Sequence, residues 1–578
     1  MPNKPLLAQD RPSSEHSHER AAAEDDALLG YRNESTTLPR RPGFWRELGL
    51  FVWAVAATAA VIILGVLVQH RHETQSDDGA SKPTSKRNLI FMVSDGMGPA
   101  SLSLTRSFRQ FERDLAIDDI LNLDKHLLGQ SRTRSSSSLV TDSAAGATAF
   151  SCGRKSYNGA ISMLDGYVPC GTVLEAAKRA GYMTGLVVTT DLTDATPACF
   201  ASHVNTRWEQ DSIAAQEVGE HPLGRVVDIM LGGGRCHFLP NTTEGGCRQD
   251  GRDITKLAQE KYGWNYVNDR AGFDSLKLGK NVKLPMLGLF ASTDIPFEID
   301  RQQLNEIYPS LDEMARTALA ALEEATKDSD KGFFLMIEGS RIDHAGHGND
   351  PAAQVREVLA YDKAFGSVLN FLDKSMTEGV MVATSDHETG GLSIARQLHP
   401  TYPQYLWYPE VLYNASHSAE WLGFKLFEKA LPEAKMSDKD LEHFIREDLV
   451  KSGLGILDAT DDEIAAALEY RLVASTVFAD MISRRAQIGW STHGHSAVDV
   501  NIYGSKGAES LRGNHENTEI GNFLHSYLDV DVDAITKELQ DKAKSNAMGA
   551  TLMKGPSKEE LLRAEHHYDA ATAHQQGY

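Results

Sequence analysis

The sequence has few basic residues for its size. Its 578 residues include 58 Lys and Arg against 80 Asp and Glu, which gives a formal net charge of −22. Residues 1–87 contain equal numbers of basic and acidic side chains, so the negative charge falls on the remainder of the chain. Affinity for nucleic-acid phosphates depends on clustered Lys and Arg. We therefore exclude nucleic-acid binding.

Several common sequence signatures are also missing. There is no G-x-S-x-G elbow and no G-x-x-x-x-G-K-[ST] loop, so elbow-type hydrolase chemistry and P-loop chemistry find no support. No internal repeat is present. Hydrophobic residues nevertheless make up 41% of the chain, which is enough for a large buried core and excludes a fully disordered protein.

One long uncharged run lies near the N-terminus. Residues 48–68 (LGLFVWAVAATAAVIILGVLV) contain no charge, and as a helix they extend about 31 Å, enough to cross a hydrocarbon core of ~30 Å. The alternatives are a buried core helix and a cleaved signal peptide, whose apolar region is shorter and closer to the first residue. We predict a single transmembrane signal-anchor helix.

The flanking charges predict the orientation of this helix. Arg40, Arg41 and Arg46 precede it, whereas Arg71 is the only Lys or Arg in the ten residues that follow. Because basic residues stay on the cytosolic side, residues 1–47 should be cytosolic and the body should lie across the membrane, as in a single-pass type II protein. Residues 69–87 are polar and are expected to form a solvated stalk.

The cytosolic segment is polar and rich in Pro, Ser and Glu, so we expect it to be disordered. Within it, Glu24, Leu28 and Leu29 fit the pattern E-x-x-x-L-L of an acidic dileucine sorting signal, which clathrin-adaptor complexes bind. This short pattern often arises by chance, but here it lies on the correct side of the predicted membrane span.

All five cysteines lie beyond the span. Cys152 with Cys170, and Cys236 with Cys247, are close enough in sequence to form small disulfide loops in an oxidising lumen. Cys199 would remain, and we expect it to be a buried thiol and not a reactive one. Sequons at Asn241 and Asn414 could carry glycans on the same side, although sequons are common by chance.

The body, residues 88–540, alternates apolar runs with helical patterns. The runs at 88–93, 185–190, 333–337 and 379–384 are typical of strands buried on both faces, and the segments 172–180 and 311–325 are typical of helices. This alternation predicts an α/β fold with a central, mostly parallel sheet sandwiched by helices. Residues 399–485 lack the pattern, contain a helical stretch at 437–449, and are expected to be an insertion. Residues 541–578 form a polar tail.

Each predicted strand is followed by side chains that can bind cations. Ligands bind beyond the carboxyl ends of the strands in open α/β sheets. Taken singly, an Asp-Gly pair is usually a turn and a lone His is usually a hydrogen-bonded surface group. The set comprises Asp95 after the first run; Asp191, Asp194 and Thr196 after the second; Glu338, Asp343 and His347 after the third; and Asp386 and His387 after the fourth.

These side chains predict a multi-metal centre. Converging carboxylates repel one another unless cations lie between them, and imidazole with carboxylate suits zinc whereas oxygens alone suit magnesium. Asp343 and His347 are four residues apart and would share a helical face, and the later motif THGHS offers His493 or His495. Metals ~3.5–4 Å apart commonly bind the entering and leaving oxygens of a transferred phosphoryl group.

Ser143 is the candidate nucleophile. It lies in TDSAAGATAF, where a helix that starts at the serine would direct backbone N–H groups and its positive dipole end at an anion. The motif contains no adjacent histidine base, so coordination to zinc would have to activate the hydroxyl. Taken alone, the segment could be an ordinary capped helix.

Six motifs in order give a family resemblance: VSDGMG, TDSAAGATA, DATPACFASHVNTR, EGSRIDHAGH, SDHETGG and THGHS. Together they resemble the alkaline phosphatase family from about residue 88 to 530. With the N-terminal anchor, the chain is similar to the vacuolar, membrane-anchored members in fungi. A related two-metal phosphodiesterase or phosphomutase generally lacks the serine motif and the EGSRIDHAGH block in this form. An inactive ectodomain acting as a receptor or scaffold is disfavoured because every expected ligand type is present.

The resemblance implies a role for each site residue. Ser143 would become a phosphoserine, and Arg207 would bind the phosphate. The cofactors implied are two Zn²⁺ and one Mg²⁺ per subunit. The ligands would be Asp343, His347 and His495 for one zinc; Asp95, Asp386 and His387 for the other; and Asp95, Thr196 and Glu338 for magnesium. Asp142, Asp194 and His344 would lie beside them, and Asp194 and His344 occupy positions that vary in the family.

The resemblance also implies a biological setting. It implies a homodimer that hydrolyses phosphate monoesters of many kinds, with an alkaline optimum. It places the catalytic domain in the vacuolar lumen, with the chain held in the vacuole membrane. The insertion at 399–485 would correspond to the variable crown region of the family.

Overall fold

The computed structural model describes residues 53, 58 and 86–545. The expected cytosolic tail with Glu24, Leu28 and Leu29, nearly all of the expected span and stalk, and residues 546–578 lie outside the described residues. Among the helices that are described, none combines the length and the apolar composition needed to cross a membrane.

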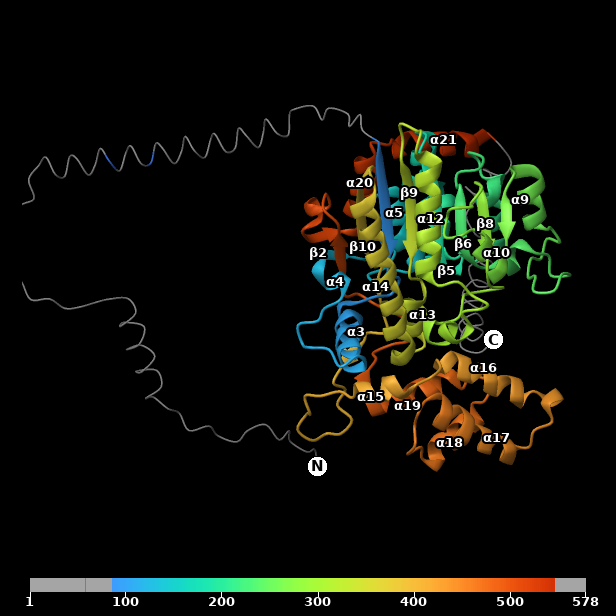
Figure 1. The fold of residues 1–578 in the computed structure, drawn as a ribbon, viewed down its shortest axis with the longest axis vertical. Helices are drawn as coiled ribbons and strands as arrows, with labels where there is room; N and C mark the ends of the chain where they lie inside the picture. Colours follow the sequence, from blue (N-terminus) through green and yellow to red (C-terminus); the bar gives the residue numbers. More distant parts are fainter. Residues whose placement is uncertain (1–52, 54–57, 59–85, 546–578) are drawn as a thin grey trace, which may run out of the picture. The chain divides into compact units, whose positions relative to one another are not determined.

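A ten-stranded sheet forms the centre of the fold (Figure 1). Its strand order is β16-β2-β15-β10-β1-β9-β5-β6-β8-β7, and β15 alone runs opposite to the other nine strands. The predicted mostly parallel sheet is therefore confirmed. The strands are β1 (Arg87–Val93), β2 (Leu127–Arg132), β5 (Met183–Asp191), β6 (Ile229–Gly233), β7 (Asn265–Val267), β8 (Met286–Leu289), β9 (Phe333–Glu338), β10 (Glu378–Thr384), β15 (Val500–Gly504) and β16 (Gly513–Glu516).

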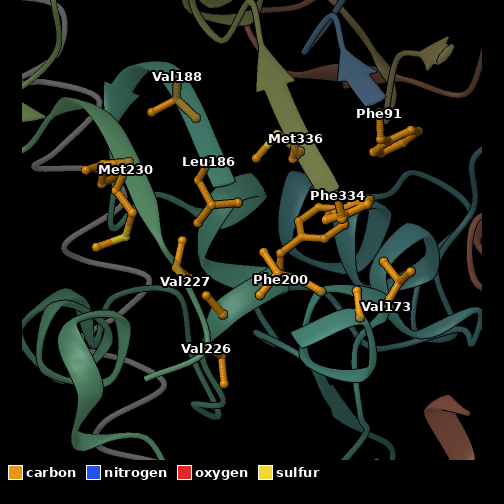
Figure 2. Packing of buried hydrophobic residues seen from close by; sticks show 14 of the residues in the cluster. Phe91, Val173, Leu186, Val188, Phe200, Val226, Val227, Met230, Phe334 and Met336 are labelled. Atoms are coloured by element: carbon orange, nitrogen blue, oxygen red, sulfur yellow. The ribbon is translucent and has the colours of Figure 1, made fainter. Parts of the chain in front are cut away.

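Helices cover both faces of this sheet. Alternate residues of β1 enter two separate hydrophobic clusters, Leu89 and Phe91 on one face and Ile90 and Met92 on the other. Both faces therefore require apolar side chains, which is why β1 is an uninterrupted apolar run and not an alternating one. Figure 2 shows the first cluster, where Phe91, Phe200 and Phe334 pack together.

The helices divide between these two clusters. The first face is covered by α5 (Ser143–Cys152), α6 (Val173–Arg179), α7 (Ala195–Ala201), α8 (Gln210–Ala215), α9 (Ile254–Tyr262) and α20 (Asn517–Leu528). The second is covered by α4 (Asn122–Lys125), α10 (Arg270–Ser275), α12 (Leu311–Thr326) and α14 (Pro351–Lys374). The remaining helices of the body are α3 (Pro99–Glu112), α11 (Glu298–Arg301), α13 (Arg341–His347) and α21 (Val532–Ser545).

A helical subdomain leaves the body between two short paired strands. Strands β12 (Ser393–Ile394) and β13 (Ile488–Gly489) are antiparallel, with Ile394 opposite Ile488. The subdomain has its own hydrophobic cluster, which includes Phe108 of α3 and Val355 of α14, so it packs on the body beyond the carboxyl ends of the strands (Figure 1). Its helices are α15 (Pro409–Asn414), α16 (Ala419–Ala430), α17 (Asp438–Phe444), α18 (Asp461–Glu469) and α19 (Ser475–Ala486).

The smaller elements complete the chain path. Two further strand pairs are β3 (Met163–Leu164) with β4 (Val168–Pro169), and β11 (Glu388–Thr389) with β14 (His495–Ser496). The short 3₁₀ and π segments are η1 (Gln216–Glu220), η2 (Arg235–Phe238), η3 (Gln302–Leu304), η4 (Pro432–Ala434), η5 (Ile445–Gly453) and η6 (Glu509–Leu511).

The cysteines meet in the two pairs expected from their spacing. Cys152 pairs with Cys170, and Cys236 pairs with Cys247. Cys199 is buried as a free thiol, 3.3 Å from the carbonyl oxygen of Ala144.

Candidate active site

The expected site residues gather where the parallel strands end. Asp95 follows β1, Glu338 is the last residue of β9, and Asp386 and His387 follow β10. Asp343 and His347 lie on α13, which follows β9 directly, and Thr196 lies in the first turn of α7, beyond β5. Because these strands are parallel, their carboxyl ends deliver the side chains to one edge of the sheet.

The first candidate metal group consists of Asp95, Asp386 and His387. All three residues are buried. His387 Nε2 lies 3.1 Å from Asp386 Oδ2, 3.6 Å from Asp95 Oδ1, and 3.1 Å from the Ser143 hydroxyl. The nucleophile candidate therefore contacts an atom of the metal group itself.

Ser143 contacts His387, although the motif TDSAAGATAF itself contains no histidine. The two residues are 244 positions apart in sequence. His387 Nε2 also belongs to the candidate metal group, and a nitrogen that ligates a metal has no lone pair left to accept a proton. We therefore do not assign His387 as a general base.

The second group consists of Asp343, His347 and His495. His347 Nε2 lies 3.3 Å from Asp343 Oδ2, and His495 Nε2 lies 3.6 Å from Asp343 Oδ1. The two imidazole nitrogens are 3.1 Å apart.

Hydrogen bonds fix the tautomers of these histidines. His347 Nδ1 contacts the carbonyl oxygen of His493, and His495 Nδ1 lies 2.8 Å from the carbonyl oxygen of Thr141. A carbonyl only accepts, so each Nδ1 carries the proton and, in the neutral rings, each Nε2 presents a lone pair. Burial, followed by the charge of His387, lowers the pKa of His495 to about 3, which keeps it neutral. Two lone pairs and a carboxylate that converge in this way suit zinc.

The structure also separates the two histidines of the THGHS motif. His495 belongs to the second group, whereas the ring of His493 is exposed and its Nδ1 lies 2.8 Å from the carbonyl oxygen of His347. The His493 backbone orients His347, but its side chain is not part of the group. The imidazole of His495 stacks on that of His387 with centroids 3.5 Å apart, which joins the two groups.

A third set of donors contains only oxygens. The Ser340 hydroxyl donates to Glu338 Oε2 at 2.7 Å, and the Thr196 hydroxyl lies beside the same carboxylate. Burial raises the pKa of Glu338 to about 8, and the nearby charges of Asp194 and Asp386 act in the same direction. A cluster of hydroxyl and carboxylate oxygens is the chemistry that magnesium prefers.

Three buried oxygens test whether cations fit these groups. Within residues 86–545, Asp95 Oδ1, Asp386 Oδ2 and Thr196 Oγ1 are buried and make no hydrogen bond. Burial raises the pKa of Asp95 well above its usual range, and Asp386, Asp343 and Glu338 raise it further. Buried polar groups are normally satisfied, and divalent cations bound by these oxygens would satisfy all three. The donor sets therefore fit metal ions.

Helix α5 positions the nucleophile candidate. Its N-cap is Asp142, whose Oδ1 accepts a hydrogen bond from Ala145 N at 3.0 Å and whose Oδ2 accepts one from Gly159 N at 2.8 Å. Ser143 is therefore the first residue of the helix, where backbone N–H groups point outward. A Cβ on Gly146 would lie 2.9 Å from Asp386 Cβ, so glycine at this position allows the helix to approach the metal group closely.

Arg207 lies between two carboxylates beside this helix. Its Nη2 is 2.7 Å from Asp194 Oδ1, and its Nη1 is 3.7 Å from Asp142 Oδ2. Burial lowers the pKa of Arg207, but Asp194 and Asp142 raise it by more, so the guanidinium stays charged. Its planar fork can bind two phosphate oxygens at once.

His344 is held by a residue that the sequence did not reveal. Its Nδ1 lies 3.1 Å from Asp294 Oδ2. Burial lowers the pKa of His344, but the Asp294 charge and hydrogen bond outweigh it and raise the pKa to about 9. Asp294 follows no predicted strand, so no sequence signal marked it.

Thr389 was also missed. Its hydroxyl donates to Asp343 Oδ1 and lies 3.2 Å from His387 Nδ1, so it contacts a residue of each metal group. Its place in the motif SDHETGG was the available signal. The sequons also lie on the surface: Asn241 and Asn414 are both exposed.

The chain is similar to known alkaline phosphatases over most of its length. The chain is 54% identical over 506 residues to the repressible alkaline phosphatase of Saccharomyces cerevisiae, covering 84% of this chain and 87% of that protein. It is 46% identical over 529 residues to an alkaline phosphatase of Schizosaccharomyces pombe, covering 90% and 94% of the two chains. A crystal structure of a cold-active alkaline phosphatase from Shewanella sp. superimposes with a TM-score of 0.63 at 29% identity, covering 76% of this chain and 99% of that one.

The sequence profile of the alkaline phosphatase family matches residues 86–530, which span the whole central sheet and every candidate metal ligand. With relatives this similar over most of its length, the chain belongs to the alkaline phosphatase family.

Proposed function

We propose that this chain is a metal-dependent phosphatase that hydrolyses phosphate monoesters through a phosphoserine on Ser143. The family membership supports the reaction class. The observation that carries the proposal is the position of Ser143. Ser143 is the first residue of α5, and its hydroxyl lies 3.1 Å from His387 Nε2 in the cluster of carboxylates and imidazoles. Arg207 Nη1 lies 3.7 Å from Asp142, the N-cap of the same helix.

Three sets of residues would hold the metals. When bound, the metals would supply Lewis acidity, neutralise phosphate charge and orient the reacting oxygens. We assign two Zn²⁺ and one Mg²⁺ per subunit: Asp343, His347 and His495 would hold one zinc, Asp95, Asp386 and His387 the other, and Asp95, Thr196 and Glu338 the magnesium.

The side chains of the site would perform the first displacement. Arg207 binds two phosphate oxygens, and the N-terminal N–H groups of α5 add favourable partial charge. The Ser143 Oγ attacks phosphorus and loses its proton to solvent. The bond between phosphorus and the alcohol oxygen breaks, and the alcohol leaves after taking up a proton.

The second displacement would reverse these roles. A water attacks the phosphorus of phosphoserine 143, and the bond between phosphorus and Oγ breaks. Ser143 recovers a proton, and inorganic phosphate leaves from the contact with Arg207. Positioning and charge neutralisation account for most of such a reaction, which agrees with a site made largely of fixed charges.

The substrate range and the location of the protein form the second part of the proposal. We propose broad specificity, because the residues assigned here would hold the phosphoryl group or the metals, and none is assigned to the alcohol. We further propose a homodimer that is anchored in the vacuole membrane by residues 48–68, with the catalytic domain in the lumen. A clathrin-adaptor complex would bind Glu24, Leu28 and Leu29. The predicted topology supports this proposal, as do the resemblance to fungal family members and the paired cysteines.

The test is hydrolysis of a chromogenic phosphate monoester near pH ~9 by the full chain in detergent. We expect activity as purified, loss after chelation, and recovery with zinc and magnesium. Ser143→Ala should abolish turnover, whereas the matched control Ser151→Ala, on the same helix, should retain it. Hydrolysis of phosphodiesters in preference to monoesters, or no activity with zinc fully bound, would contradict the proposal.

A further inference from the structure

A second buried charged cluster lies away from the metal groups, within the first face of the sheet. Glu175 of α6 has one carboxylate oxygen, Oε1, that lies 2.8 Å from His203 Nε2 and 2.8 Å from His221 Nε2. All three residues are buried. The other oxygen, Oε2, accepts a hydrogen bond from Thr172 N at 2.8 Å, as part of the N-terminal capping box of α6.

One carboxylate and two imidazoles resemble the donor set of a metal site. The positions of the protons on the two imidazole rings, however, are not those of metal ligands. Leu223 N donates to His221 Nδ1 at 3.0 Å. That nitrogen therefore carries the lone pair, and the proton of the neutral ring lies on Nε2, which faces Glu175. A metal bound at His221 Nε2 would require the opposite tautomer and would set two N–H groups against each other at Nδ1.

His203 instead carries protons on both ring nitrogens. Its Nδ1 lies 3.1 Å from the carbonyl oxygen of Ser162, which can only accept, and its Nε2 faces the Glu175 carboxylate. The cluster is therefore a buried ion pair between His203 and Glu175. The pKa directions agree: burial opposes both charges, but each partner overcomes it for the other, so the pKa of His203 is raised and that of Glu175 is lowered.

The backbone of His203 is held as firmly as its ring. The side-chain amide of Gln216 makes two hydrogen bonds to this backbone. His203 N donates to Gln216 Oε1 at 2.9 Å, and Gln216 Nε2 donates to His203 O at 3.0 Å. His203 therefore has four polar contacts, two from its ring and two from its backbone, and all of them are buried. Such an arrangement fixes the position of a chain segment far more closely than packing alone.

The segment that His203 fixes ends at Arg207. Between them, Val204 pairs with Ile161 as an antiparallel bridge, and Arg207 N donates to Gly159 O at 2.8 Å. The loop that contains Gly159 and Ile161 also contacts the helix of the nucleophile, because Gly159 N donates to Asp142, the N-cap of α5. The segment therefore ties the guanidinium and the serine to one loop.

We propose that Glu175, His203 and Gln216 are positioning residues for Arg207, and that they set the affinity of the site for the phosphoryl group. None of them touches the substrate. Glu175 holds the ring of His203, Gln216 holds its backbone, and the short segment from 203 to 207 carries the guanidinium to its place between Asp142 and Asp194. This inference rests on the proposed role of Arg207 in binding phosphate.

The experiment measures inhibition of the full-length enzyme by inorganic phosphate, together with KM for a phosphate monoester. Glu175→Gln keeps the size of the side chain but removes the charge that pairs with His203. Gln216→Met keeps the volume but removes both bonds to the His203 backbone. Because small misplacements of a binding group cost up to ~10²-fold, we expect each variant to raise Ki for phosphate about tenfold, with zinc content unchanged.

Two controls separate positioning from general destabilisation. Lys178→Gln lies on the same helix and breaks the 2.6 Å ion pair with Asp228, which is not connected to Arg207; it should change Ki by less than about twofold. In an Arg207→Ala background, Glu175→Gln and Gln216→Met should also change Ki by less than about twofold, because the group that they position is absent.

The outcomes separate the positioning role of Glu175 and Gln216 from the role of Arg207 in binding phosphate. An unchanged Ki in both variants, or the same increase in the Arg207→Ala background, overturns the positioning role. If Glu175→Gln does not fold, Gln216→Met decides the question. If Arg207→Ala alone leaves Ki unchanged, the proposed role of Arg207 in binding phosphate fails first, and the positioning role fails with it.

Discussion

Removal of the metals should lower the free energy of unfolding, because it leaves three buried oxygen atoms without a partner. Asp95 Oδ1, Asp386 Oδ2 and Thr196 Oγ1 are buried and make no hydrogen bond within the described part of the chain. Each such group costs about 1–3 kcal/mol when it is left unsatisfied, so together they cost about 3–9 kcal/mol. An unfolding entropy of ~2 cal/mol/K per residue gives about 1 kcal/mol/K over the folded body, so chelation should lower Tm by about 3–9 °C.

Asp95→Asn should reverse its effect when the metals are removed. With metals bound, the variant loses a ligand and should melt below the wild type. Without metals, it loses the carboxylate that burial and the charges of Asp386, Asp343 and Glu338 disfavour, so it should melt above the wild type. The folded pKa of Asp95 is raised above its unfolded value, so the metal-free wild type loses stability as pH rises through that pKa, and the advantage of the variant grows with pH.

The assay is calorimetry of the full chain in detergent, with and without a chelator, at pH ~5 and pH ~8. Ser143→Ala is the matched control, because its hydroxyl is not one of the three unsatisfied atoms; it should melt with the wild type in both states. Equal Tm values before and after chelation would show that bound metals do not stabilise the three buried oxygens. A decrease in Tm for Asp95→Asn of the same size in both states would show that the carboxylate of Asp95 is not destabilising when the metals are absent.

Three other perturbations have defined outcomes. Arg207→Ala should remove about 2–5 kcal/mol of affinity for phosphate, a factor of about 30 or more in Ki; a change below about threefold would contradict the charge-assisted contact. Gly146→Ala should lower kcat by at least about tenfold, because its Cβ would lie 2.9 Å from Asp386 Cβ, and an unchanged kcat would show that the helix can move away. Arg270 donates to Glu313 at 2.7 Å, and although burial opposes the charge, this bond and the hydrogen bonds from Ser310 hold the pKa of Glu313 down to about 2. Its contribution to stability is therefore present above its unfolded pKa and is lost as pH falls toward about 2, so Glu313→Gln should cost about 1 kcal/mol at neutral pH and nothing at the acid end of a denaturation series.

The sequence predicted the central strands because their burial leaves a simple signal. Strands β1, β5, β9 and β10 are covered on both faces, so their apolar runs are uninterrupted and their ends are sharp. The strand at the β16 edge of the sheet has no such apolar run in its sequence. Strand β16 (Gly513–Glu516) has the sequence GNHE and is partly exposed, and its pairing with β2 joins segments almost 400 residues apart.

The residues of the site could be predicted from the sequence where a carboxylate lies at the end of a strand or directly after it. Asp95, Glu338 and Asp386 were found in this way. Contacts made by folding alone were not: the pairing of Ser143 with His387, of His344 with Asp294, and of Glu175 with His203 depends on how distant segments pack. Periodicity and motif spacing carry no information about such contacts.

The most direct test of the phosphoserine mechanism is to trap the covalent intermediate. The full chain, loaded with zinc and magnesium, is incubated with a labelled phosphate monoester, quenched in acid and digested, and the phosphorylated peptide is identified by mass spectrometry. The phosphoserine mechanism predicts a phosphoryl group on Ser143 and none in Ser143→Ala, which should also be inactive. Turnover by the wild type without a phosphopeptide at Ser143, or sustained activity of Ser143→Ala, would contradict it.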